Sequence, residues 1–294
     1  MSATNLTFGE VRGQLAQRFP SATLSQLTSF LNERYRRVAR SLRWVDLSLQ
    51  AVLQTIAPYE TGTLAATSGS ASITGTGTTW TSAMSGRGIR IGSDNAYYQF
   101  TYASATTATL DRTYEGDTAT AAEYKIWQSI YPLAADVRTL KSMRVTSCPY
   151  DLDPVSQEEL DERDAARLTY GTPSCYALHM PDLSTPARRQ VELWPIPDDA
   201  FGVPFWYVQD PTLFAVGDTA TYLPTYLSPT VLYQGVEADV KRIVEKDLAA
   251  AREAEGLYRE SLSEMRSEEA DRRPQTRMKL AERYTEHRRR RWTR

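Results

Sequence analysis

The stretch from Ser228 to Asp271 reads SPTVLYQGVEADVKRIVEKDLAAAREAEGLYRESLSEMRSEEAD, and it decides the kind of fold the chain can form. Serine followed by proline is typical of a helix start, because serine caps free amide groups and proline is preorganised for the first helical position. The apolar residues that follow recur with a period near 3.7 residues, which indicates one helical stripe. The stripe consists of Leu232, Val236, Val240, Val244, Leu248, Ala251, Tyr258, Leu262 and Met265.

This stripe predicts one long helix from 229 to 270, with any bend at Gly256. At 1.5 Å per residue the helix would be about 60 Å long, longer than a domain of this size needs for its own core. We therefore expect its distal half to pack on another subunit. Beyond Asp271, the run Arg272-Arg273-Pro274 should interrupt the helix, because proline removes a helical hydrogen bond.

The last residues, 271 to 294, differ from the rest of the chain in charge. Between Arg272 and Arg294, ten Arg or Lys face only Glu282 and Glu286, a net charge of +8. The whole chain has a formal charge of −2, so the remainder carries −10. We expect an extended basic tail with too few apolar groups to fold alone. It could grip an acidic protein crevice, bind nucleic acid or remain solvated.

The N-terminal region predicts two helices between residues 7 and 43. Thr7 with Glu10 and Thr23 with Gln26 have the spacing of capping boxes. In the second helix an apolar stripe comprises Leu24, Leu27, Leu31, Tyr35, Val38 and Leu42. Its other face is basic, with Arg34, Arg36, Arg37, Arg40 and Arg43. This face is either simply solvated or a contact surface for a partner.

Residues 61–128 have a different texture, rich in Thr, Ser, Ala and Gly, with short alternating runs broken by turn residues. They predict an inserted all-β barrel or sandwich with strands near 63–66, 70–74, 87–92, 96–103, 107–111 and 122–128. Four later runs, 137–145, 175–179, 190–194 and 203–208, predict a second, small sheet, and 156–167 predicts a charged surface helix. The expected fold class is α+β: a discontinuous helical, ring-forming core (1–60 and 129–270), the β module (61–128) and the tail (271–294).

No arrangement of residues suggests catalysis. The two histidines, His179 and His287, have no cysteine or carboxylate at metal-ligand spacing, and no Gly-x-Ser-x-Gly elbow occurs. The acidic residues between Asp151 and Asp164 favour a solvated face or docking patch over a glycosidase pair. We expect no enzyme activity, no cofactor, no metal and two reduced cysteines, Cys148 and Cys175. No run approaches the roughly 18 apolar residues of a membrane span, so no membrane partner is expected.

The order of several segments resembles that of podovirus-type phage head-to-tail adaptors, also called tail accessory, head-completion or neck connector proteins. The second helix contains Phe30-Leu-Asn-Glu-Arg-Tyr-Arg-Arg-Val-Ala-Arg40, followed by Trp44. Ser72–Trp80 and Gly88–Gly92 are similar to β-domains that recur in phage neck and tail proteins. Further similar segments are Tyr131–Arg138, Gly171–Leu178 and Val191–Asp198. The resemblance covers most of residues 20–250 and contains no catalytic motif.

The resemblance implies a structural virion protein in the neck, made in the host cytoplasm and placed between the capsid portal and the tail. Its partners would be other copies of itself in a ring of 12, the portal protein, a downstream neck or tail protein, and DNA passing through the channel without sequence specificity. Alternatives are another neck component, such as a stopper or tail terminator, and a nucleic-acid-binding protein that acts through its basic tail.

Two sets of residues are predicted to make these contacts. The portal-docking set is Arg272, Arg273, Arg277, Lys279, Arg283, Tyr284, Arg288, Arg289, Arg290, Arg291 and Trp292. The subunit-interface set is Leu24, Leu31, Tyr35, Val38, Leu248, Tyr258, Leu262 and Met265.

Overall fold

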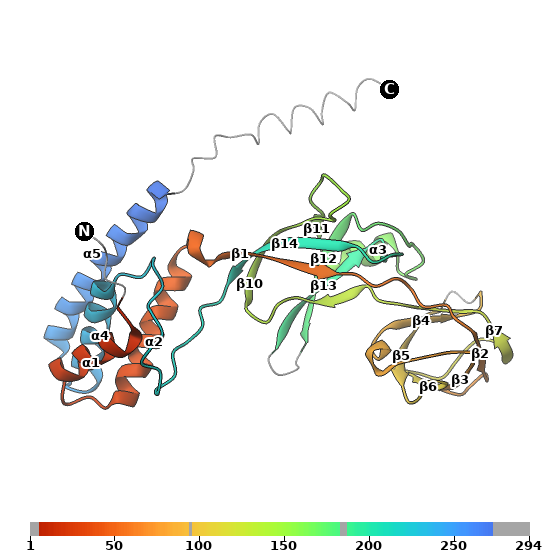
Figure 1. The fold of residues 1–294 in the computed structure, drawn as a ribbon, viewed down its shortest axis with the longest axis horizontal. Helices are drawn as coiled ribbons and strands as arrows, with labels where there is room; N and C mark the ends of the chain where they lie inside the picture. The colour runs from red at the N-terminus through yellow and green to blue at the C-terminus, as the bar shows by residue number, and fades with distance from the viewer. Residues whose placement is uncertain (1–5, 94–95, 183–186, 273–294) are drawn as a thin grey trace, which may run out of the picture. The chain divides into compact units, whose positions relative to one another are not determined.

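A computed structural model describes residues 6–93, 96–182 and 187–272 of the chain (Figure 1). The chain divides into two compact units, a helical unit of residues 1–47 and 211–294 and a β unit of residues 48–210. The fold is mixed α+β, as expected. The units differ from the predicted domains, because residues 48–60 and 129–210 belong with the β strands rather than with the helices.

The helical unit contains four α-helices and a short 3-10 helix among its described residues. They are α1 (Phe8–Arg18), α2 (Leu24–Ser41), η1 (Val45–Leu47), α4 (Pro229–Ile243) and α5 (Leu248–Arg272). Both predicted capping boxes are confirmed, since the Thr7 and Thr23 hydroxyls accept from the amides of Glu10 and Gln26 at 3.2 Å. The segment 210–228, between β14 and α4, contains no helix or strand. It packs on the helices, since the ring of Phe214 stacks on that of Phe8 with centroids 4.4 Å apart.

The prediction of one continuous helix from 229 to 270 is wrong. The α4 helix ends at Ile243, and Lys246 has a φ of 59°, a left-handed conformation that a helix cannot contain. The Asp247 carboxylate then caps the amides of Ala249 and Ala250 at 3.1 and 3.0 Å, which starts α5. The helices α4 and α5 pack against each other as a hairpin. Gly256, the expected bend, lies inside α5, which continues through it as one helix. An apolar period cannot distinguish one helix from two that bury their stripes in the same core.

Seven strands of the β unit form one antiparallel, nearly closed, barrel-like sheet in the order β7-β2-β3-β6-β5-β4-β8 (Figure 1). The strands are β2 (Thr63–Ala66), β3 (Ser72–Thr76), β4 (Gly88–Ile91), β5 (Tyr98–Tyr102), β6 (Thr107–Leu110), β7 (Ala119–Ala122) and β8 (Tyr124–Trp127). Their core is separate and includes Trp80, whose indole N–H donates to the Tyr124 hydroxyl at 3.0 Å. The predicted compact all-β module is confirmed.

The remaining strands form two further sheets rather than the single small sheet that was predicted. One has the order β1-β14-β10 and the other β11-β12-β13-β9, with the helix α3 (Gln157–Arg163) beside them. The strands are β1 (Ser48–Gln54), β9 (Ile130–Pro132), β10 (Val137–Met143), β11 (Asp153–Val155), β12 (Cys175–Asp182), β13 (Arg188–Trp194) and β14 (Gly202–Gln209). Both sheets contribute to one apolar core, for instance Phe205 from β14 and Val191 from β13. Alternation along a strand gives its buried face but not its neighbours, so the sequence did not separate the two sheets.

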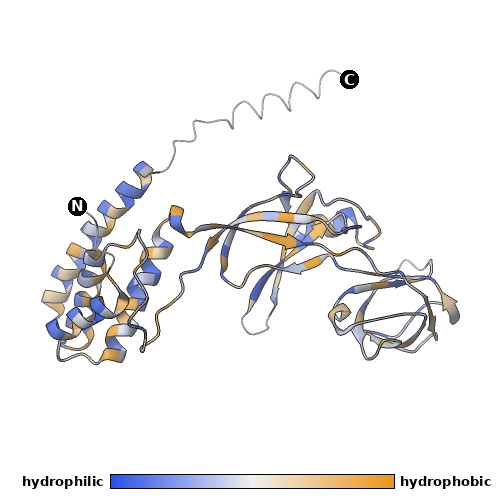
Figure 2. Ribbon diagram, in the orientation of Figure 1, coloured by the Kyte–Doolittle hydropathy of each residue, from blue (hydrophilic) through white to orange (hydrophobic). Residues whose placement is uncertain are grey.

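Among the described residues, no helix combines the length and the apolar content that a membrane span needs. Figure 2 shows polar and apolar residues interleaved along the helices, and the end of α5 near Arg272 is mainly hydrophilic.

The left-handed turn at Lys246 predicts a stability change of opposite sign to the one that a continuous helix would show. Replacing Lys246 by Gly should raise the free energy of unfolding of the helical unit by about 0.5–1 kcal/mol, because glycine adopts a positive φ without strain. In a continuous helix the same change would lower it by about 1 kcal/mol. Urea unfolding followed by far-UV circular dichroism measures the difference, and Lys246→Val, which is strained at positive φ, should be the least stable of the three.

Candidate functional site

The centre of the helical unit is a buried arginine. Arg34 on α2 has a side chain that is 0% exposed, and its Nε and Nη2 donate to the two carboxylate oxygens of Asp239 on α4 at 2.6 and 2.7 Å. Nη2 also lies 2.8 Å from Oε2 of Glu255 on α5, and the guanidinium carbon lies 4.6 Å from the centre of the Tyr258 ring. One side chain therefore joins three helices.

The two carboxylates keep this buried arginine charged. Burial by itself lowers the pKa of Arg34, but the hydrogen bonds and charges of Asp239 and Glu255 outweigh it, so the pKa is raised above its ordinary value. The sequence placed Arg34 on the basic face of its helix, which is incorrect. Its distance of three residues from Leu31 and four from Val38 was the available signal that it lies beside the buried stripe.

Gly235 on α4 makes room for this arginine. A Cβ atom at this position would lie 2.9 Å from Cδ of Arg34 and 3.1 Å from Cδ2 of Tyr258. A side chain here would push the guanidinium away from its carboxylates, so the sequence needs glycine at this point of the helix.

The predicted subunit-interface residues divide into two groups. Leu31, Tyr35, Val38, Tyr258, Leu262 and Met265 are buried within the chain's own helical unit. Only Leu24 and Leu248 are exposed, at 52% and 59%. The folding back of α5 explains this division, because the stripe expected to need another subunit is covered by α4 and α2.

A shallow groove of about 430 Å³ lies on the outside of the α4–α5 hairpin. We call it the α4–α5 groove, and it is lined by Ala238, Arg242, Leu248, Ala251, Arg252, Glu255, Gly256 and Arg259. Its floor is made of small and apolar residues and its rim is rich in arginine. Leu248, which is 59% exposed, is one of the residues that line this groove.

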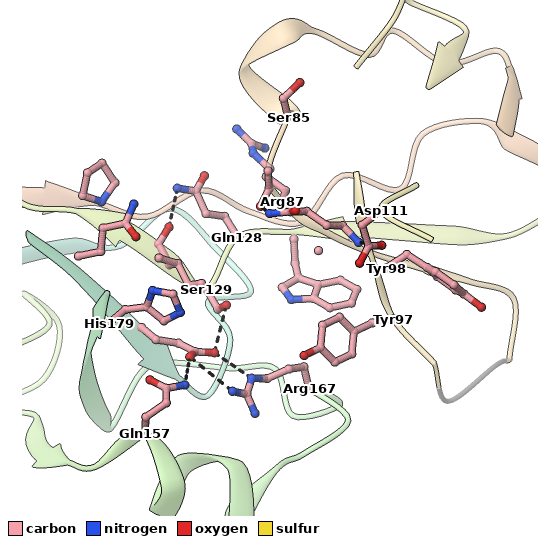
Figure 3. A pocket seen from close by; sticks show the side chains of 18 of the residues that line it. Ser85, Arg87, Tyr97, Tyr98, Asp111, Gln128, Ser129, Gln157, Arg167 and His179 are labelled. Atoms are coloured by element: carbon pink, nitrogen blue, oxygen red, sulfur yellow. Dashed lines mark hydrogen bonds and ion pairs between the residues drawn. The ribbon is translucent and has the colours of Figure 1, made fainter. Parts of the chain in front are cut away.

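The β unit contains a larger cleft, of about 760 Å³, between the end of the barrel-like sheet and the β12–β13 strands (Figure 3). A buried ion pair forms part of its wall, with Nε of Arg167 2.8 Å from Oε1 of Glu192. Glu192 also accepts from Gln157 at 2.5 Å and from Ser129 at 3.4 Å. His179 lines the same cleft, and its Nδ1 is buried with no hydrogen-bond partner.

This arrangement favours a structural role for the cleft's charged groups. Glu192 accepts hydrogen bonds from the side chains of Arg167, Gln157 and Ser129, and these bonds hold it in the wall of the cleft. Asp164 behaves similarly: burial raises its pKa, but hydrogen bonds from the Leu168 and Thr169 amides, each 2.8 Å, outweigh that effect and lower it. Within the described residues, no three His, Cys, Asp or Glu side chains come close enough to hold a metal ion. The Arg167–Glu192 pair was not predicted, because its partners lie 25 residues apart in the chain.

Most of the predicted portal-docking residues lie outside the described part of the chain. Only the backbone of Arg272 is described, as the last residue of α5. Outside the described residues are Arg273, Arg277, Lys279, Arg283, Tyr284, Arg288, Arg289, Arg290, Arg291 and Trp292.

The chain matches no known protein-family model and no curated protein.

The Arg34 cluster predicts a large stability effect at Asp239. The change Asp239→Ala removes the bidentate partner of the buried guanidinium and leaves it the single contact with Glu255, so it should lower the free energy of unfolding of the helical unit by about 3–5 kcal/mol. The matched control is Arg37→Ala, which removes the exposed pair with Glu33 on the same helix and should change it by less than about 0.5 kcal/mol. Equal effects in urea unfolding would contradict the central role of Arg34.

The glycine beside Arg34 predicts a second contrast. Gly235→Ala should lower the stability of the helical unit by about 1–3 kcal/mol, because the added methyl group crowds Arg34 and Tyr258. Gly13→Ala is the control, since a Cβ there meets nothing within 4 Å and alanine is the better helix former. The control should be neutral or stabilising by up to about 1 kcal/mol when both variants are compared by urea unfolding. A harmless Gly235→Ala would mean that Arg34 has room to move.

Proposed function

We propose that the chain is a structural virion protein of a tailed bacteriophage, a head-to-tail adaptor. Its copies form a ring under the portal, extend the DNA channel and provide the attachment site for the tail. The sequence resemblance supports this proposal by the order of its segments. The observation that carries it in three dimensions is an apolar, arginine-rimmed groove on a helical unit whose own core is already complete.

The completeness of that core is the first step. Arg34 and the main apolar stripes of α2, α4 and α5, such as Leu31, Val236 and Leu262, are buried within one chain. The groove therefore is not a gap left in folding, and Leu248, which lines it, remains 59% exposed. An exposed leucine that lines a groove on a folded surface is typical of a contact between proteins.

The less buried side of the α2 helix is positively charged. It carries Arg36, Arg37 and Arg40, and Arg43 follows two residues after the end of the helix. In a ring around DNA, arginines at a surface contact phosphates without reading base sequence. On a surface that faces away from the channel, the same residues would contact an acidic surface of a neighbouring neck protein.

The basic tail supplies the test. Removing residues 273–294 leaves α5 intact to Arg272, so the helical circular dichroism signal should be unchanged apart from the lost residues. Binding to the portal protein encoded by the same genome should be lost, because the docking segment is gone. A full-length variant with Arg288–Arg291 replaced by Gln separates charge from length and should bind more weakly than the original chain. Normal portal binding by the truncated protein would refute tail docking.

A further inference from the structure

The helix α5 has two charged sides that flank its buried row. Arg252, Arg259 and Arg266 repeat every seven residues along one side, which we call the basic row. Along the other side is the acidic stripe, made of Glu253, Glu260, Glu264, Glu268 and Asp271. With 3.6 residues per turn, the two sets point about 130° apart around the helix axis.

The basic row continues into the α4–α5 groove. Arg252 and Arg259 line the groove together with Arg242 of α4. Counting Arg34 beneath the groove, four arginines meet two carboxylates, Asp239 and Glu255, so the site has a net charge of +2. An excess of positive charge around an apolar floor of Leu248, Ala251 and Ala238 calls for an occupant that is both acidic and apolar.

The acidic stripe has these two properties. All five of its carboxylates are exposed, and no described Arg or Lys forms an ion pair with them. Leu257 lies on the same side of the helix between Glu253 and Glu260, and it is 49% exposed. The stripe therefore presents an apolar knob with acidic neighbours, complementary to the groove in charge and in hydrophobicity.

We propose that the acidic stripe of one copy docks on the α4–α5 groove and basic row of the next copy, so that Leu257 packs against Leu248. The two surfaces are different and point about 130° apart around α5, so in the proposed contact each copy uses its groove on one neighbour and its acidic stripe on another. The contact is heterologous, of the head-to-tail type that closes into a ring when its rotation permits. This inference rests on the proposed adaptor function, because it names the contact that would build the ring.

Charge reversal tests the pairing in the full-length chain. One variant carries Arg252→Glu, Arg259→Glu and Arg266→Glu, so that groove and stripe are both acidic. The other carries Glu253→Lys, Glu260→Lys and Glu264→Lys, so that both are basic. Each variant alone should associate with itself about a hundredfold more weakly than the original chain in analytical ultracentrifugation, because like charges face each other. All these side chains are exposed, but Nε of Arg259 lies 3.7 Å from Oε1 of Glu255, so far-UV circular dichroism and urea unfolding must first show that each variant is folded.

The decisive sample is the equimolar mixture of the two variants. The acidic groove of the first accepts the basic stripe of the second, and the basic groove of the second accepts the acidic stripe of the first. Mixing should therefore restore assembly with the two variants in alternation, and so should combining all six changes in one chain. Variants that are monomeric alone and in the mixture would overturn the pairing. Unchanged assembly of both single variants would overturn it while leaving a ring intact, whereas an original chain that stays monomeric, with or without portal protein, would contradict the adaptor function as well.

Discussion

Burial of the Arg34 charge is the constraint on which the helical unit depends. A guanidinium removed from water is costly unless carboxylates surround it, and here they come from two other helices, Asp239 from α4 and Glu255 from α5. Glu255 can reach Arg34 only if α5 turns back along α4. The left-handed turn at Lys246 and the glycine at position 235 both follow from this requirement. The arginine thus specifies a hairpin where the apolar pattern alone would permit a straight helix.

Local features of the sequence predicted local structure well. Capping boxes and turn residues act over a few positions, so both N-terminal helices and most strands of the barrel-like sheet lie close to where they were expected. What the sequence did not predict depends on partners far apart in the chain. Arg34 and Asp239 are separated by 205 residues, and the runs that were assigned to one sheet belong to two. An apolar period reports that a face is buried, but it does not report what covers it.

The difference between a buried face and what covers it also explains why most of the predicted interface residues lie in the core. Six of the predicted interface residues were chosen because they form an apolar stripe, and such a stripe is first of all a core. The surface features that remain after folding are more informative: Leu248 in the α4–α5 groove, Leu257 within the acidic stripe, and the arginines of α2. These depend on knowing which side of each helix is covered. In the β unit, the hydrogen bonds that Glu192 accepts from Gln157 and Arg167 likewise depend on partners that are distant in the sequence.

We propose that a self-sufficient helical unit uses its outer charged surfaces to build a ring beneath a portal. Electron microscopy of the full-length chain mixed with the portal protein of the same genome is the most direct test. We expect a closed ring under the portal, with the α4–α5 hairpins of adjacent copies in contact and the DNA channel continuous through it. Single copies scattered on the portal, or a ring joined only through the β units, would contradict it.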